Sequence, residues 1–461
     1  MKLLLDLKKI TRLFFLIGVF FIPFNSFEGF GLLGEFDRDS CVVFFLIAFG
    51  IMFFWKKISI PFRSTIFQLL IVLLLWFVIS VVFNFHDVTH YYFKNTSGIT
   101  RFLRQYTSVI ISSILLFLVF YNVIKTHSFI DIIYKIRTVI LYSLIVVVIY
   151  GTIEYLILKF KINSLRNVLY LFDYFPFTSV NIDRYTFRMS SVTFEPPALA
   201  TYLISISGWM FSYILTNKGY MRFIPALLVV LFSFLSGSRA GFFIIIVQVF
   251  VFLMFLLKDK KFKKLFVNFL LVSIFGGMIV ILLFGKKIGE TFYEKLSSFK
   301  TDDDIHANSN KTRFGIQYAM FQVFLENPIT GTGYSLQAFE SKDKYPDWAT
   351  KNNWEFRLKH LNEDHKSFPP GFNLYLRLLA ETGIIGFLIF TLFITYILLW
   401  CFNNTFKKSG DQTIIALLIT ISMVGFIFNW LKMDTFRVYG FWLTLAILII
   451  EEQRLKVNEK N

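Results

Sequence analysis

Long apolar runs separated by short polar connections make up most of the sequence. Twelve of these runs approach the length of about 20 residues that a helix needs to cross the hydrocarbon core of a bilayer. The pattern predicts an all-α polytopic membrane protein with about twelve transmembrane helices. The expected spans lie near residues 10–24, 40–55, 65–85, 105–124, 138–158, 197–216, 222–236, 240–257, 265–285, 373–400, 412–430 and 437–450.

One long polar stretch, from Lys286 to Gly371, interrupts this pattern between the ninth and tenth spans. Loops in compact proteins usually have about 4–6 residues, so a stretch of this length is expected to have a structure of its own. The sequence therefore predicts a membrane block (1–285), a large and partly helical loop (286–371) and a second membrane block (372–461).

Within this loop, residues 310–327 carry apolar side chains at helical spacing, among them Ile316, Met320, Val323 and Phe324. This spacing predicts an amphipathic helix that lies on the membrane surface, with Arg313 near its beginning and close to the lipid headgroups. Asn327-Pro328 is expected to end the helix, and Gly331–Tyr334 to form a turn.

Basic residues separate the two sides of the predicted membrane. Lysine and arginine gather in the connections between even-numbered and odd-numbered spans, as in the run 258–264. By the positive-inside rule, this side and both termini are cytoplasmic, and the large loop faces outward. These membrane-facing cations also account for most of the formal net charge of +17, which therefore needs no nucleic-acid partner.

No spacing in the sequence is typical of a metal site or a disulfide framework. Cys41 and Cys401 lie in or beside apolar runs, far apart in the chain. Asp302–Asp304 with His306 could bind a divalent cation, but a solvated acidic loop is the simpler interpretation, and nothing completes a site around His86 and His90. We expect no metal and no other cofactor.

Ionisable residues near the predicted spans are candidates for function because burying a charge in the membrane is costly. Glu154 is expected to lie near the outer end of its span, where its carboxyl reaches water. Arg377 and Glu381 are one helical turn apart, so they either neutralise each other or line a polar cavity.

Two outer segments carry the strongest candidates. Glu195 precedes Pro196-Pro197, which suit a first helical turn, so Glu195 is either a simple N-terminal cap or a general base in a cavity. The segment 236–241 predicts a tight hairpin that places Arg239 at the outer membrane boundary. Arg239 either reaches toward the interface as a structural residue or binds phosphate through its planar guanidinium.

Three segments resemble one known family. They are SGSRAGF (236–242), RFGIQYAMFQVFLENPITGTGY (313–334) and FNLYLRLLAETGIIGF (372–387). Together they resemble the Wzy-type O-antigen polymerases and the O-antigen ligases, over about residues 185–390. The resemblance implies a polytopic inner-membrane enzyme with a large periplasmic loop. Such an enzyme transfers undecaprenyl-diphosphate-linked oligosaccharides without nucleotide sugars or a metal.

The resemblance also implies roles for single residues. Arg239 and Arg313 match the family's arginines and would hold the diphosphate leaving group, with Arg188 as a weaker match. Ligases and many polymerases have a histidine, the proposed base, in a His-Asn pair ahead of the last motif, whereas this chain has Phe372 followed by Asn373. We therefore hypothesise that Glu195 is the base. The remaining candidates for substrate contact are Tyr334, His365, Asn373 and Arg377.

These observations favour a glycosyltransferase that polymerises surface polysaccharide at the periplasmic face. Its expected partners are the lipid-linked oligosaccharide, membrane lipids and a protein that sets chain length. Two alternatives stay open at this point. One is an O-antigen ligase that uses lipid A-core as acceptor and a loop histidine such as His360 or His365. The other is a lipid-linked oligosaccharide transporter, although the sequence lacks the internal repeat typical of that class.

Overall fold

The computed structural model describes residues 2–31, 33–55, 58–183, 187–258, 262–264, 266–267, 307–407 and 412–458. It is an all-α architecture with one two-stranded antiparallel sheet in the described part, in which Tyr92 pairs with Ser97 and Phe93 with Thr96. The predicted span 265–285, the acidic run 302–304 and His306 lie outside the described residues, apart from a few positions at the start of that span.

The helices follow the apolar runs of the sequence, and each predicted span other than 265–285 coincides with a helix. The elements are α1 (Lys2–Phe20), α2 (Ser40–Phe54), α3 (Thr65–Phe83), α4 (Phe85–His90), β1 (Tyr92–Phe93), β2 (Thr96–Ser97), α5 (Gly98–Ile110), a π-helix (Ile111–Leu116), α6 (Phe117–Lys125), α7 (Phe129–Phe160), α8 (Arg166–Leu169), α9 (Pro196–Thr216), α10 (Ile224–Leu235), α11 (Arg239–Lys258), α13 (Ala307–Glu326), α14 (Gln337–Ser341), α15 (Asp347–Thr350), a π-helix (Phe356–His360), α16 (Leu374–Phe402), α17 (Gln412–Asn429) and α18 (Tyr439–Asn458).

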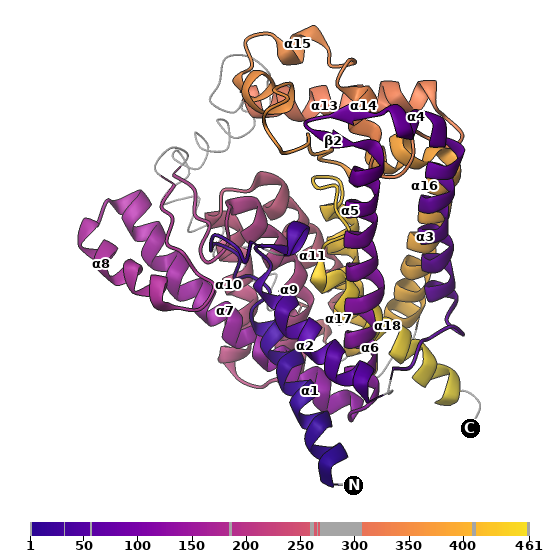
Figure 1. Ribbon diagram of the computed structural model, residues 1–461. Coiled ribbons are helices and arrows are strands. Elements are labelled where there is room, and N and C mark those ends of the chain that lie inside the picture. Colours follow the sequence, from indigo (N-terminus) through magenta and orange to yellow (C-terminus); the bar gives the residue numbers. More distant parts are fainter. Residues whose placement is uncertain are drawn as a thin grey trace.

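Six helical segments in the described chain are long and apolar enough to cross a membrane. They are Thr65–Phe83, Gly98–Lys125, Phe129–Phe160, Pro196–Thr216, Arg239–Lys258 and Leu374–Phe406, and three shorter apolar helices accompany them. The number and length of these helices make the protein a multi-pass membrane protein. The total of twelve crossings stays a prediction. The N-terminus and the C-terminus lie at one end of the bundle, and α13, α14 and α15 cover the opposite end (Figure 1).

Helix α9 is the most enclosed of the six, with 83% of its apolar segment buried, and it packs against α10, α11 and α17. Small residues permit this close approach: a Cβ on Gly208 would come within 2.5 Å of the backbone oxygen of Leu418 in α17. The buried side chain of Gln248 in α11 donates to the backbone oxygens of Ile204 in α9 and Ile421 in α17. These contacts fix the start of α9, and with it the position of Glu195.

The polar region above the bundle is attached to a break in α16. Gly383 has non-helical dihedral angles inside this helix (φ 63°, ψ −169°), which only glycine adopts readily. The carbonyls of Ala380 and Glu381 accept hydrogen bonds from the backbone N–H groups of Thr332 and Gly333. The predicted turn 331–334 is thus confirmed, and it closes the gap in the hydrogen bonding of α16.

Helix α13 confirms that this segment is helical, but its apolar residues lie on two sides and not on one, and the expected apolar face contacts protein. Ile316, Met320 and Val323 are buried against Ala349, Phe356 and Ala380. A second apolar stripe of the same helix is exposed, made of Phe314, Tyr318, Phe321 and Leu325. A position on the membrane surface stays a prediction, and it now rests on this second stripe.

Candidate active site

An open cavity of about 470 Å³ lies where the start of α9, the start of α13 and the loop between α17 and α18 meet. The cavity brings together two of the three residues predicted to be catalytic, Glu195 and Arg313. Its other ionisable lining residues come from segments far apart in the sequence: Asp39, Tyr202, Lys432, Asp434, Arg437 and Tyr439.

Glu195 precedes α9, and Pro196 occupies the first helical position as predicted. The backbone carbonyl of Glu195 accepts from the N–H groups of Ala198 and Leu199 (3.0 and 3.2 Å). Glu195 occupies the N-cap position of α9, as one of the two alternatives expected, but its carboxylate makes no capping hydrogen bond. The carboxylate is exposed and faces the cavity, where it is available to a ligand.

The electrostatic surroundings of Glu195 are mainly cationic. Partial desolvation by the cavity walls raises the pKa of its carboxyl, while Arg313, Arg188 and Lys432 act to lower it. A carboxylate with a raised pKa is a stronger proton acceptor than an ordinary surface carboxylate. The geometry therefore suits a general base held among cations.

The loop that precedes Glu195 is anchored from within the membrane block. Glu154 of α7 is completely buried, which contradicts the expectation that its carboxyl reaches water. Its two carboxylate oxygens accept from the backbone N–H groups of Ser190 (3.2 Å) and Ser191 (2.7 Å). Because a buried carboxylate needs such donors, Glu154 fixes the backbone between Arg188 and Glu195.

Arg188 belongs to the loop before α9, and its side chain packs against Gly237 in the tight hairpin between α10 and α11. A Cβ on Gly237 (φ 67°) would lie 3.2 Å from Nε of Arg188, so this position needs glycine. Burial lowers the pKa of Arg188, and the charges of Arg313 and Arg239 add to this effect while Glu195 opposes it. Arg239, the first residue of α11, is therefore close enough to join the same cationic cluster.

Arg313 lies on the first turns of α13, exposed to the cavity. Its guanidinium stacks over the ring of Phe372, with 5.2 Å from Cζ to the ring centroid. Phe372, where the resemblance led us to expect a histidine, has a left-handed backbone (φ 55°). The aromatic ring here orients an arginine and cannot exchange a proton.

Lys432 is the site residue that the sequence reasoning missed. It lies in the loop between α17 and α18 and lines the cavity beside Glu195 and Arg313. Burial lowers its pKa to about 7, Arg313 and Arg188 contribute, and Glu195 opposes the shift. One signal could have identified it: a lysine and an arginine, Lys432 and Arg437, stand together in a loop predicted to be on the cation-poor side.

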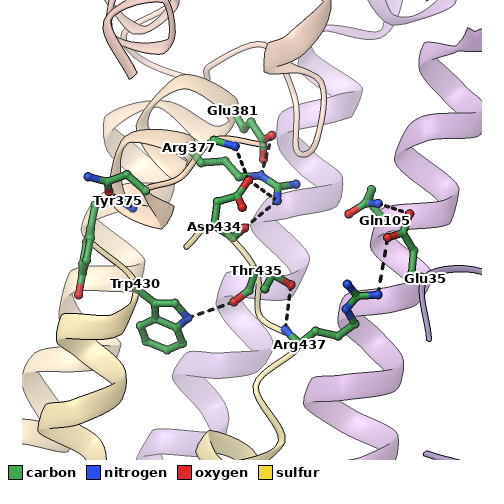
Figure 2. Close-up of polar contacts among 11 residues, drawn as sticks. Glu35, Gln105, Tyr375, Arg377, Glu381, Trp430, Asp434, Thr435 and Arg437 are labelled. Atoms are coloured by element: carbon green, nitrogen blue, oxygen red, sulfur yellow. Dashed lines mark hydrogen bonds and ion pairs between the residues drawn. The ribbon is translucent and has the colours of Figure 1, made fainter. Parts of the chain in front are cut away.

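The loop that carries Lys432 is held by a neutralised cluster (Figure 2). Arg377 donates from Nε to Glu381 (3.0 Å) and from Nη1 to the backbone oxygen of Asp434 (2.7 Å), with the Asp434 carboxylate 3.5 Å away. The pairing of Arg377 with Glu381 is the first of the two expected alternatives and is confirmed. Arg377 therefore positions the loop and does not line the cavity.

Further contacts in Figure 2 fix the rest of this loop. The indole N–H of Trp430 donates to the backbone oxygen of Thr435 (3.1 Å). Nη1 of Arg437 lies 3.7 Å from the carboxylate of Glu35, which also accepts from Gln105. Lys432 thus projects from a well-supported backbone.

Three predicted substrate contacts lie away from the cavity lining. Asn373 caps α16, and its Oδ1 accepts from the N–H groups of Tyr375 and Leu376. Tyr334 is buried and stacks on Phe77 at 4.1 Å between ring centroids. The backbone carbonyl of His365 accepts a hydrogen bond from the buried Nζ of Lys94. His365 is not among the residues that line the cavity. Their roles in substrate contact stay predictions.

Metal-ligating residues do not gather in the described part of the chain: it contains no group of three or more His, Cys, Asp or Glu side chains. Both cysteines are buried and free. The cations nearest Glu195 in the cavity wall, Arg313 and Lys432, suit an anionic ligand better than a metal cation.

Comparison with known proteins relates part of the chain to one enzyme family. The model of a family described as O-antigen ligase matches residues 224–391, which include Arg239 and Arg313 but neither Glu195 nor Lys432. No match to a curated protein was found. Members of the matched family are glycosyltransferase-like enzymes of glycan assembly. Residues 224–391 are therefore similar to the O-antigen ligase family, and the resemblance to the Wzy-type polymerases and O-antigen ligases is confirmed.

Proposed function

We propose that the protein polymerises surface-polysaccharide repeat units at the periplasmic face of the inner membrane. The growing glycan would leave its undecaprenyl diphosphate and join the terminal sugar hydroxyl of an incoming lipid-linked unit. One observation carries the proposal. In a chain that matches the O-antigen ligase family over residues 224–391, a cavity holds the carboxylate of Glu195 beside Arg313 and Lys432, and Arg188 is close enough to interact with it.

The chemistry requires both kinds of group. Glu195 takes the proton from the attacking hydroxyl, whose oxygen forms a bond to the anomeric carbon. The bond between that carbon and the diphosphate oxygen breaks, and its electron pair stays on the diphosphate. Arg313 and Arg188, with Arg239 nearby, stabilise the negative charge that develops there. An in-line displacement of this kind inverts the anomeric configuration.

The description of the matched family makes the O-antigen ligase the second candidate, with lipid A-core as acceptor. The position at which ligases carry a histidine is Phe372 in this chain, beside Arg313. No histidine of the described residues lines the cavity. These placements favour the polymerase over a histidine-dependent ligase.

Purified protein supplied with lipid-linked repeat units, without nucleotide or added metal, tests the proposal. We expect a ladder of longer lipid-linked glycans on a gel. Product that forms only after lipid A-core is added would make the protein a ligase. If neither product forms in lipid vesicles that contain the protein, enzymatic transfer would be contradicted and transport favoured.

A further inference from the structure

Lys432 is unusual among the described residues in the surroundings of its side-chain nitrogen. Its Nζ is buried, and among the described residues it makes no hydrogen bond. An ammonium group in such a place loses hydration without compensation, which is costly. Lys432 nevertheless lines the cavity, and contacts of Arg377 and Trp430 fix the backbone of its loop. The loop therefore holds Lys432 in a defined position.

The charged groups around Lys432 come from four segments. Arg313 of α13 and Arg188 of the loop before α9 are cationic, and Glu195 is anionic. On its own loop, Asp434 already accepts from Gly371 N–H and pairs with Arg377. Glu195 is therefore the one carboxylate of this set left to balance Lys432 and two guanidinium groups.

We infer that Lys432 is a titrating diphosphate-binding residue that takes up a proton when the anion enters the cavity. This inference rests on the proposed function and adds a residue and a pH dependence to it. Each phosphate of the lipid-linked donor carries one negative charge, and breaking the glycosidic bond leaves a further negative charge on the diphosphate. The proton that Lys432 takes from solvent adds a positive charge, which balances the added negative charge on the diphosphate. When Lys432 loses this proton, release of the diphosphate product is favoured.

Binding of P1,P2-dimethyl diphosphate, measured by calorimetry in two buffers of different ionisation enthalpy, tests the inference. This probe has one fixed charge on each phosphate and does not titrate near neutral pH, so any proton taken up comes to the protein. At pH 8, a pKa of about 7 leaves about nine-tenths of Lys432 neutral. We expect the wild-type protein to take up most of one proton on binding.

Three variants locate this proton. Lys432→Met should bind about tenfold or more weakly and take up none. Lys432→Arg, which is always charged, should bind well and also take up none. Glu195→Gln should still take up the proton, which excludes Glu195 as its acceptor. The exposed Lys366→Met is the matched control and should behave as wild type.

Absence of binding, or binding without proton uptake by the wild-type protein, would overturn the inference. Unchanged proton uptake in Lys432→Met would overturn it as well, and the binding-competent Lys432→Arg guards against misfolding as an explanation. The assay involves no sugar and no turnover. A normal glycan ladder together with proton uptake that does not depend on Lys432 would contradict this inference alone. Proton-linked binding without any glycan transfer would contradict only the proposed function.

Discussion

Two arginine clusters interact with the loop between α17 and α18, and they differ in how their charge is balanced. Arg377 is buried and neutralised by Glu381 and Asp434 within 3.0 and 3.5 Å. Arg313 and Lys432 line a cavity, Arg188 lies near them, and Glu195 is the carboxylate that interacts with all three. The first cluster is neutralised within the protein, whereas the proposed function assigns an anionic ligand to the second. Residue type alone therefore does not separate structural from catalytic arginines.

The largest expected effect is that of removing the lone carboxylate. Glu195→Gln should reduce the rate of glycan transfer by about 10²–10⁴-fold, because the attacking hydroxyl loses its proton acceptor. The melting temperature should stay within error of wild type, since the Glu195 side chain makes no capping bond. Exposed Glu363→Gln serves as the control. Wild-type polymer from Glu195→Gln would remove Glu195 from the mechanism.

Substitution in the cluster of Arg377, Glu381 and Asp434 should lower the stability of the protein, in contrast to Glu195→Gln. Arg377→Met leaves Glu381 and Asp434 without their cation, and breaking a buried pair costs about 3–5 kcal/mol. We expect a clear fall in melting temperature. The double variant Arg377→Met/Glu381→Met should be less destabilised than the single one. Equal melting of Arg377→Met and wild type would show that the cluster is not structural.

Arg313→Ala should lower the rate of transfer by about 10²–10³-fold through lost stabilisation of the leaving diphosphate. Because Arg313 is exposed to the cavity, its loss should hardly change the melting temperature. Arg313→Lys should recover part of the rate. A transporter would tolerate both Arg313→Ala and Arg239→Ala, so normal glycan export by these variants would favour transport.

The pH dependence of stability should carry the signature of Lys432. Its pKa is about 7 in the folded protein and about 10.4 in an unfolded chain. Between these values the unfolded state binds more protons, so this residue makes the folded state more stable as pH rises. Without any anion, the melting temperature of wild type should therefore rise relative to Lys432→Met between pH 7 and pH 9. Parallel curves for the two proteins would contradict the lowered pKa.

The smallest effect is expected for the loop histidines. His360 and His365 do not line the cavity, and burial lowers the pKa of His360 to about 4. His360→Ala and His365→Ala should therefore change the transfer rate less than about threefold. A loss of more than tenfold, with the fold intact, would favour a histidine-dependent ligase.

Local patterns in the sequence were enough to predict much of this structure. Apolar runs gave the helices, Pro196 gave the start of α9, and the spacing of Arg377 and Glu381 gave their ion pair. Each of these features depends on neighbours within one helical turn or one span. The hairpin before Arg239 was predictable for the same reason, since Gly237 adopts a left-handed backbone there.

Features that depend on contacts between distant segments could not be predicted in this way. Glu154 looked like a surface carboxyl because nothing in its own helix shows that Ser190 and Ser191 will cover it. Helix α13 has apolar residues on two sides, so the spacing of Ile316 and Met320 could not tell which side meets protein. Lys432 joins the site through a fold that brings α9, α13 and the last loop together.

The most direct test is whether a lipid-linked repeat unit occupies the cavity. Phe372 lines it beside Arg313, so a photo-reactive benzoylphenylalanine at this position would report the nearest ligand. We predict labelling by a radioactive lipid-linked unit at position 372, competed by dimethyl diphosphate, and none at the exposed position 174. Equal labelling at both positions, or none at 372 in an active protein, would contradict the placement of the reaction in this cavity.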